Sequence, residues 1–535
     1  MKTNIIYKLL LPVLGVFVLS SCSEEWMDVN TDPNNPSEAT LNLLLPGAQA
    51  AKVFSMTRDM NKNTMVFSRM VYDLQESQYL QDATTYSNDY DGLFYNSLKE
   101  MQEIIDLGTA DGSWHYVGVA KIMKAHTYGL MVDLWGDLPY SEALQGDAFL
   151  TPVFDDDANI YSQLIALLDE GIADLEKEST LALENDLIYS NNVSRWITAA
   201  NTIKLKMLIN IRKVDAATAT AGINALIADG DLIDATNENY SFRFGSGDSP
   251  LNRHPLYQIE YAGAGDKDYY MSNYFMYNMI IKNDPRLPYY IYRQASNADL
   301  TFETTPCNTR TDCIYWPLLV GLGDVADGYI GRDHGDPSGI PGDNELRATF
   351  GVYPIGGSYD DDARQERTIG DGAQGAGILE YVTSSMRAFM LAEAKLTLPG
   401  VTGGKTAVEY LEEGIRASMD AVESFSMGVQ GSGAVPMADS LVDAYVADRI
   451  ADFNAATDNN LKLNVVIKEK FYAQFGNGME TFTDVRRTEF PGDLPRSLAP
   501  LAAFPLRLPY SSTEIGSNPN TPDVTQSEPV FWDVN

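Results

Sequence analysis

Two of the three cysteines, Cys307 and Cys313, are close enough in sequence to bond to each other or to share a metal ion. A structural zinc site would need further cysteine or histidine ligands. The only histidines are scattered along the chain: His115, His126, His254 and His334. We therefore expect a local disulfide and no metal site, because such bonds form when a chain is exported. Closing so short a loop contributes about 2 kcal/mol.

Aromatic residues suggest a ligand-binding region. Residues 240–329 hold 17 aromatics among 90 positions, or about 19%, against 10% for the whole chain. An aromatic ring packs against the C–H face of a sugar, while Asn, Asp and Arg side chains recognise its hydroxyls. The candidate residues are Tyr315, Trp316 and Tyr329. A second stretch, 79–95, contains four tyrosines, from which we select Tyr86 and Tyr90. For each residue the alternative is packing in the core, the commonest fate of an aromatic side chain.

No pattern in the sequence assigns a catalytic residue. The chain has 74 acidic residues, so chance pairs of carboxylates are inevitable, and nothing places two of them in a shared cleft. Serine-hydrolase motifs such as G-x-S-x-G are absent. Arg486 and Arg487 suit an anionic ligand, but on a helix we expect them to pair with acidic side chains. We predict a protein without enzymatic activity or cofactor. Calcium in the Asp-rich loops stays an open alternative, with no site to name.

The charge of the chain excludes one class of ligand. Removing residues 1–21 removes Lys2 and Lys8 and takes the formal charge from −36 to −38. A field of this sign repels phosphate backbones, so we expect no nucleic-acid partner.

The N-terminus has the features of an export signal. The apolar run 9–19 has the length of a signal-peptide core and is too short to span a bilayer. Ser20, Ser21 and Cys22 follow, and this order resembles the lipobox of bacterial lipoproteins. In such proteins the signal is cleaved before the cysteine, which is then acylated. We expect residues 1–21 to be a signal peptide and Cys22 to carry the lipid; an ordinary signal peptide is the alternative.

The acidic pair Glu24–Glu25 after the cysteine resembles the export signal of Bacteroidetes surface lipoproteins. It favours an outer-membrane protein that faces the cell exterior. A lipoprotein facing the periplasm is the competing interpretation.

Helical periodicity dominates most of the chain. One helix should run from about Val119 to Gly136, and Asp155–Asp157 should cap the next. Further helices are expected around 196–211, in a shorter segment that ends near 228, and in several segments between 386 and 475. Residues 237–380 are rich in Gly, Pro, Asp and Tyr and break the pattern, and eight prolines lie among the last 45 residues.

These features divide the chain into a signal peptide (1–21), a lipidated tether (22–46) and one domain (47–535). Within the domain we expect a mainly α-helical scaffold of stacked helix pairs at about 47–236 and 381–490. A loop-rich insert at about 237–380 interrupts it, and an extended segment (491–535) ends the chain.

Several short strings, taken together and in order, resemble the SusD/RagB family of Bacteroidetes surface lipoproteins. The strings are DLWGDLPYSEA at 133–143, WITAANTIKLK at 196–206, DPRL at 284–287, LAEA at 391–394, DVRRT at 484–488 and PLRLPY at 505–510. Together with Cys22 they extend over nearly the whole chain. Most of them lie on the expected scaffold, so they inform fold and partner more than ligand.

The resemblance implies a scaffold of four tetratricopeptide-like helix pairs and a loop-rich half that binds ligand. It also implies a partner, a SusC-like TonB-dependent transporter of the outer membrane, over which the lipoprotein sits as a lid. Family members capture glycan, or in some branches peptide, and pass it on unaltered. We expect a polymeric nutrient, most simply a glycan, as the ligand. Peptide cargo, a surface glycosidase or peptidase, and a purely structural envelope lipoprotein are the alternatives.

Overall fold

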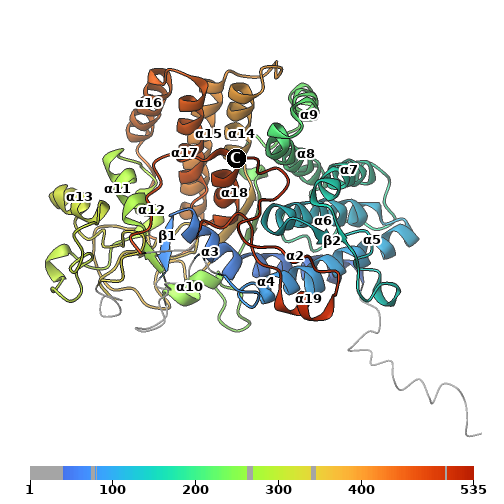
Figure 1. Cartoon of the computed structure of the whole chain (residues 1–535), viewed down its shortest axis with the longest axis horizontal. Coiled ribbons are helices and arrows are strands. Elements are labelled where there is room, and N and C mark those ends of the chain that lie inside the picture. The colour runs from blue at the N-terminus through green and yellow to red at the C-terminus, as the bar shows by residue number, and fades with distance from the viewer. Residues whose placement is uncertain (1–39, 74–78, 80, 262–268, 339–344, 500–502) are drawn as a thin grey trace, which may run out of the picture.

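The computed structural model of the chain describes residues 40–73, 79, 81–261, 269–338, 345–499 and 503–535. The expected signal peptide, Cys22 and most of the expected tether lie outside the described residues. The described part is mainly α-helical, with a scaffold of tetratricopeptide-like helix pairs and a large loop-rich insert, as the sequence predicts (Figure 1). Within it, no helix combines the length and hydrophobicity that a membrane span requires.

The scaffold has two groups of helices. The first contains α2 (Leu41–Met56), α3 (Asp59–Phe67), α4 (Ser87–Gly92), a π-helix (Leu93–Leu98), α5 (Lys99–Asp111), α6 (Trp114–Trp135), α7 (Asp157–Leu175), α8 (Val193–Asn210) and α9 (Ala216–Asp229). The second contains α14 (Ser384–Thr397), α15 (Ala407–Gly428), α16 (Asp439–Ala455), α17 (Asn459–Ala473), α18 (Gly478–Thr488) and α19 (Ser512–Ser517).

Most consecutive helices pack against each other. The two groups are joined by α14, which contacts α8 as well as α15 and α17, and by the packing of α18 against α3. Local signals set the helix ends, and the first two of the following three lie where the sequence predicts them. α6 stops before Gly136, whose φ of 78° suits a residue without a Cβ. The Asp156 carboxylate accepts the backbone N–H of Asn159 and caps α7. Thr406 and Glu409 form a capping box at the start of α15.

The insert contains short elements joined by long loops. Its helices are α10 (Pro255–Glu260), α11 (Asn273–Ile281), α12 (Leu287–Tyr290) and α13 (Tyr315–Gly321). The strands of the described chain form two-stranded antiparallel pairs: β1 (Val71–Asp73) with β5 (Tyr269–Met271), β2 (Leu138–Pro139) with β3 (Phe154–Asp155), β4 (Tyr240–Arg243) with β8 (Ile378–Val382), and β6 (Ile291–Tyr292) with β7 (Thr349–Phe350).

The buried hydrophobic residues form two clusters, one mostly in the scaffold and one mostly in the insert. The insert core extends onto the scaffold through aromatic contacts at the end of α17. The ring of Phe475 stacks on Phe275, with centroids 5.0 Å apart, and on Tyr290, with centroids 4.7 Å apart. The insert is therefore fixed to the scaffold by buried rings, which gives its loops a rigid base.

Buried polar groups explain one of the sequence strings. Asp133 has no exposed surface, and its carboxylate accepts hydrogen bonds from the Tyr161 hydroxyl (3.0 Å), the Trp532 indole (2.9 Å) and the Asn210 amide (3.2 Å). Lys206 lies 3.3 Å from the same carboxylate. This aspartate thus ties α6, α7, α8 and the C-terminal segment together.

The scaffold begins earlier than the sequence suggests, because α2 starts at Leu41, inside the segment expected to be an irregular tether. Pro46 lies within this helix. A proline there has no N–H to give to the carbonyl of Asn42 four residues before it. The side-chain amide of Asn185 donates to that carbonyl instead (2.9 Å), so the helix tolerates the proline.

Lys52 is a basic residue in the scaffold core, and no described residue gives it a carboxylate partner. Its amino group has no exposed surface and lies 2.8 Å from His126 Nδ1 and 2.8 Å from the Tyr240 hydroxyl. Burial, and then the charge of Lys206, lower the pKa of Lys52 well below its usual value. The folded chain therefore holds Lys52 neutral at a pH where the unfolded chain protonates it.

This difference predicts a pH dependence of stability. Because the unfolded state binds the extra proton, stability rises with pH up to the usual lysine pKa of about 10.4. Below the usual lysine pKa we expect the free energy of unfolding to rise more steeply with pH in the natural chain than in a Lys52→Met variant. Urea unfolding of both proteins at several pH values measures it, and equal slopes would contradict the neutral lysine.

Candidate functional site

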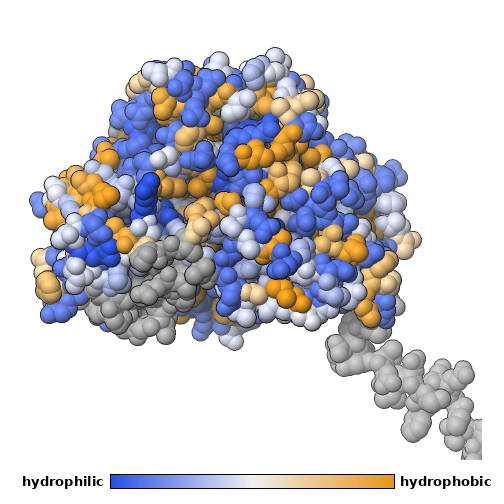
Figure 2. All heavy atoms as spheres, viewed as in Figure 1, coloured by the Kyte–Doolittle hydropathy of each residue, from blue (hydrophilic) through white to orange (hydrophobic). Residues whose placement is uncertain are grey.

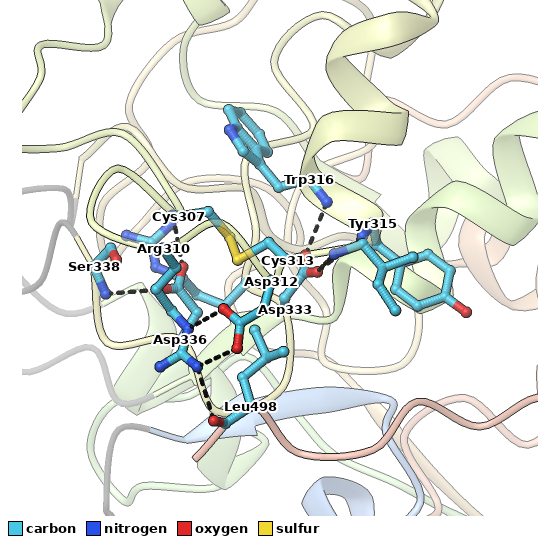
Figure 3. The surroundings of a disulfide bond; sticks show 12 residues. Cys307, Arg310, Asp312, Cys313, Tyr315, Trp316, Asp333, Asp336, Ser338 and Leu498 are labelled. Atoms are coloured by element: carbon cyan, nitrogen blue, oxygen red, sulfur yellow. Dashed lines mark hydrogen bonds and ion pairs between the residues drawn. A yellow bond between two sulfur atoms is a disulfide. The ribbon is translucent and has the colours of Figure 1, made fainter.

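The disulfide loop is the first part of the candidate site. Cys307 and Cys313 are bonded, the pairing expected from the sequence, with their Cα atoms 6.3 Å apart (Figure 3). The Asp336 carboxylate accepts the backbone N–H of Cys307 (2.7 Å) and of Ser338 (3.1 Å). Asp336 also lies near both sulfurs, but these are bonded to each other, so the group is not a set of thiolate metal ligands.

Asp333 fixes the helix that follows the loop. Its carboxylate accepts the backbone N–H groups of Ile314, Tyr315 and Trp316, each at 2.8 Å, and the side-chain amide of Asn273 at 2.8 Å. These bonds start α13 and set the directions of its first side chains. Figure 3 shows Tyr315 and Trp316 pointing to different sides of the backbone.

The structure contradicts Trp316 and Tyr329 as exposed stacking platforms. Trp316 is 7% exposed and belongs to the insert core. Tyr329 is 6% exposed, and the Arg293 guanidinium covers one face of its ring at 4.8 Å. A sugar needs an open ring face, so both residues have structural roles in this conformation. Burial of their apolar rings in the core of the insert is favourable.

Tyr86 and Tyr90 are buried as well, which contradicts the second predicted cluster. Their exposed fractions are 0% and 1%, and both rings pack edge-on against Trp135, with centroids 6.4 and 5.3 Å away. They fill the scaffold core beneath α6. Tyr95, in the same stretch, is 57% exposed. The tyrosine of this stretch with a large exposed surface is therefore not one of the two selected from the sequence.

Tyr315 remains a candidate because it is half-buried and has an aromatic neighbour at the surface. Its ring meets Tyr277 of α11, also half-buried, with centroids 5.9 Å apart, and the buried Tyr274 at 5.3 Å. Tyr277 was not singled out in the sequence analysis, although Tyr274 and Tyr277 are three residues apart on one helix and must share a face.

Polar groups lie beside Tyr274, which contacts Tyr315. The Tyr274 hydroxyl donates to Asp493 (3.0 Å), Lys468 forms an ion pair with Asp493, and Lys468 donates to the Asn278 side chain (3.2 Å). Burial, followed by the charge of Asp493, raises the pKa of Tyr315, so its hydroxyl stays protonated at neutral pH. We call Tyr277, Tyr315, Asp493 and Lys468 the Tyr277–Tyr315 surface. It combines aromatic rings with hydrogen-bond donors and acceptors.

An apolar area adjoins this surface. Exposed fractions are 57% for Ile314, 41% for Leu318 and 49% for Val320, along or beside α13. Figure 2 shows hydrophobic atoms gathered over α13 at the edge of the molecule. Solvent-exposed apolar areas of this kind are typical of binding regions.

Arg486 and Arg487 are not anion-binding residues. Arg487 forms ion pairs with Glu393 and Asp484, and Arg486 donates to the backbone carbonyls of Asp133 (2.6 Å) and Leu506 (2.7 Å). Both are buried. The prediction that they pair with acidic side chains therefore holds for Arg487, whereas Arg486 bonds to backbone carbonyls instead.

Two family models match the chain. Residues 33–306 match one described as "Starch-binding associating with outer membrane". Residues 374–525 match a second, described as "Susd and RagB outer membrane lipoprotein". No curated protein matches the chain.

Solved structures share the fold along nearly the whole chain. A chitin-binding protein is 21% identical with a TM-score of 0.70, and the alignment covers 93% of this chain and 100% of that one. A chitin-binding SusD homolog from Flavobacterium johnsoniae is 20% identical with a TM-score of 0.68, covering 92% and 99%. A SusD/RagB family protein from Bacteroides thetaiotaomicron is 19% identical with a TM-score of 0.67, covering 93% and 99%.

Proposed function

Because the chain belongs to the SusD/RagB family of outer-membrane lipoproteins, we propose that it binds a polymeric glycan at the cell surface without altering it. It then passes the glycan to a SusC-like TonB-dependent transporter, over which it sits as a lid. In this proposal Cys22 carries the lipid anchor and the protein faces the cell exterior. The lipid and the lid contact keep it beside the transporter, so the two meet at a high effective concentration.

The observation that carries the glycan proposal is the Tyr277–Tyr315 surface. Two partly open rings offer apolar faces to sugar C–H groups, and Asp493 and Lys468 offer partners for hydroxyls. The disulfide and Asp333 hold Tyr315 in place before ligand arrives, which lowers the entropy cost of binding. The names of two similar structures, both chitin-binding, support a glycan ligand.

Replacing Tyr315 with alanine tests the proposal. Loss of a stacking ring worth about 1–1.5 kcal/mol weakens binding roughly tenfold. We expect that loss in calorimetric titrations of the detergent-solubilised full chain with chitohexaose, cellohexaose, maltoheptaose and xylohexaose, at least one of which binds the natural protein. Tyr315→Phe keeps the ring and should bind within about threefold of the natural chain.

Other results would favour the alternatives. Binding of peptides and of no glycan in the same titrations would assign peptide cargo. Release of shortened sugars or peptides during the incubation would show an enzyme. Capture through a tag on this chain should recover a large outer-membrane barrel, and mass spectrometry of the mature protein should find acyl chains on Cys22.

A further inference from the structure

A groove on the scaffold, away from the insert, has the composition of a ligand site. Its volume is about 290 Å³, and its walls come from three segments: the π-helix and the start of α5, the loop 139–152, and α19. None of its lining residues belongs to residues 237–380. The groove is therefore separate from the Tyr277–Tyr315 surface. We call it the Tyr95 groove.

Exposed rings line the groove. Tyr95 is 57% exposed and Phe149 is 40% exposed, and Leu150 beside them is 80% exposed. Figure 2 shows hydrophobic atoms on the surface around α19. Tyr95 lies in the π-helix Leu93–Leu98, an interruption of the helical geometry that occurs often at functional sites. The same stretch buries its other tyrosines, so the exposure of Tyr95 is a local feature.

Polar groups accompany these rings. The Glu514 carboxylate and the exposed ammonium of Lys99 both line the groove. Asn518, only 3% exposed, donates to Glu514 (2.8 Å) and to the carbonyl of Pro152 (2.9 Å). Glu514 therefore has a fixed position and a second oxygen available for a ligand hydroxyl, and Lys99 adds a donor.

The groove is formed before any ligand binds. Asn520 donates to the carbonyl of Thr151 (2.9 Å), and Ser511 donates to Asp91 (2.8 Å). With the bond from Asn518 to Pro152, these contacts hold loop 139–152 and α4 to the C-terminal segment. A rigid groove loses little entropy when it takes up a ligand.

We propose that the Tyr95 groove is a second saccharide-binding site, which holds one or two neutral sugar rings of a polymeric glycan. Its volume lies near the small end of the range of about 300–1,000 Å³ for ligand pockets, which suits a short stretch of chain. The carboxylate of Glu514 and the strongly acidic protein disfavour acidic sugars. This proposal rests on the glycan-binding function. A polymer that reaches both sites gains avidity over one that occupies a single site.

Calorimetric titration of the full chain with short and long forms of one glycan tests the second site. With a hexasaccharide from the panel above, we expect two binding sites per natural chain and one in Tyr95→Ala. Tyr95→Phe should retain both. With the corresponding polysaccharide, affinity gels should show at least a tenfold weaker interaction for Tyr95→Ala. Because Tyr95 is largely exposed, its loss should leave the Tm nearly unchanged.

The double variant Tyr277→Ala/Tyr315→Ala separates this proposal from the function on which it rests. It should keep one site, and that site should disappear when Tyr95→Ala is added. If Tyr95→Ala binds as the natural chain does while the double variant binds nothing, the second site is overturned and the glycan-binding function stands. If the natural chain binds none of the glycans, both fail. If Tyr95→Ala lowers only the recovery of the barrel, the groove is a protein contact and the proposal is wrong.

Discussion

Replacing Glu393 with alanine is expected to lower the free energy of unfolding by about 3–5 kcal/mol. Glu393 has no exposed surface. Its carboxylate lies 2.9 Å from the Arg212 guanidinium and 2.9 Å from Arg487, which also pairs with Asp484. Lys470 lies 2.9 Å from Asp484 and brings a third cation. Without Glu393, three buried cations share one carboxylate, and the cost of desolvating them is no longer offset.

The matched control is Glu412→Ala. Glu412 also pairs with an arginine, Arg416, at 2.9 Å, but both side chains are about 40% exposed. An exposed pair of this kind contributes less than about 1 kcal/mol. Guanidinium unfolding of the two variants measures the difference. Similar small losses in both would show that the buried network does not hold the scaffold together.

The same network makes the fold sensitive to acid. Burial opposes ionisation of Glu393, but Arg212 and Arg487 outweigh it and hold the pKa of Glu393 below its usual value. The folded state therefore releases this proton more readily than the unfolded state. The resulting stability is complete above the ordinary glutamate pKa of about 4.3 and is lost as pH falls through the lower native value.

Replacing Trp316 with alanine is the second large effect, and we expect a loss of about 3–5 kcal/mol. Trp316 is 7% exposed and packs in the insert core. The adjacent Tyr315 is half-buried, so Tyr315→Ala should cost much less stability and affect ligand binding instead. Thermal unfolding and glycan titration of the two variants should therefore give opposite patterns.

This comparison decides between two assignments of neighbouring residues. If Trp316→Ala keeps its Tm and loses glycan binding, Trp316 belongs to the binding surface in a conformation other than the one described. If Tyr315→Ala unfolds the protein while its ligand affinity is unchanged, Tyr315 is a packing residue and the Tyr277–Tyr315 surface is wrong.

The fold could be predicted from the sequence because its signals are local. Gly136, Asp156 and Thr406 end or begin helices through their own backbone or side-chain chemistry, so a short window of sequence is enough. The start of α2 was missed because the group that compensates Pro46 is Asn185, more than a hundred residues away. No local pattern contains that information.

The site could be predicted only as a region. A raised content of aromatic residues identifies the insert, but the exposure of each ring depends on partners far along the chain. Tyr329 is covered by Arg293, and Tyr90 by Trp135, whereas Tyr315 keeps part of its surface beside Tyr277. Tyrosine is especially hard to place, because its ring favours burial and its hydroxyl favours the surface.

The hydrogen bond between Trp532 and Asp133 has a consequence for biogenesis. When the ribosome has synthesised the first scaffold helices, it has not yet made Trp532, whose indole donates to the buried Asp133 carboxylate. This hydrogen bond can form only once nearly the whole chain has been synthesised, so it links the first scaffold helices to the end of translation.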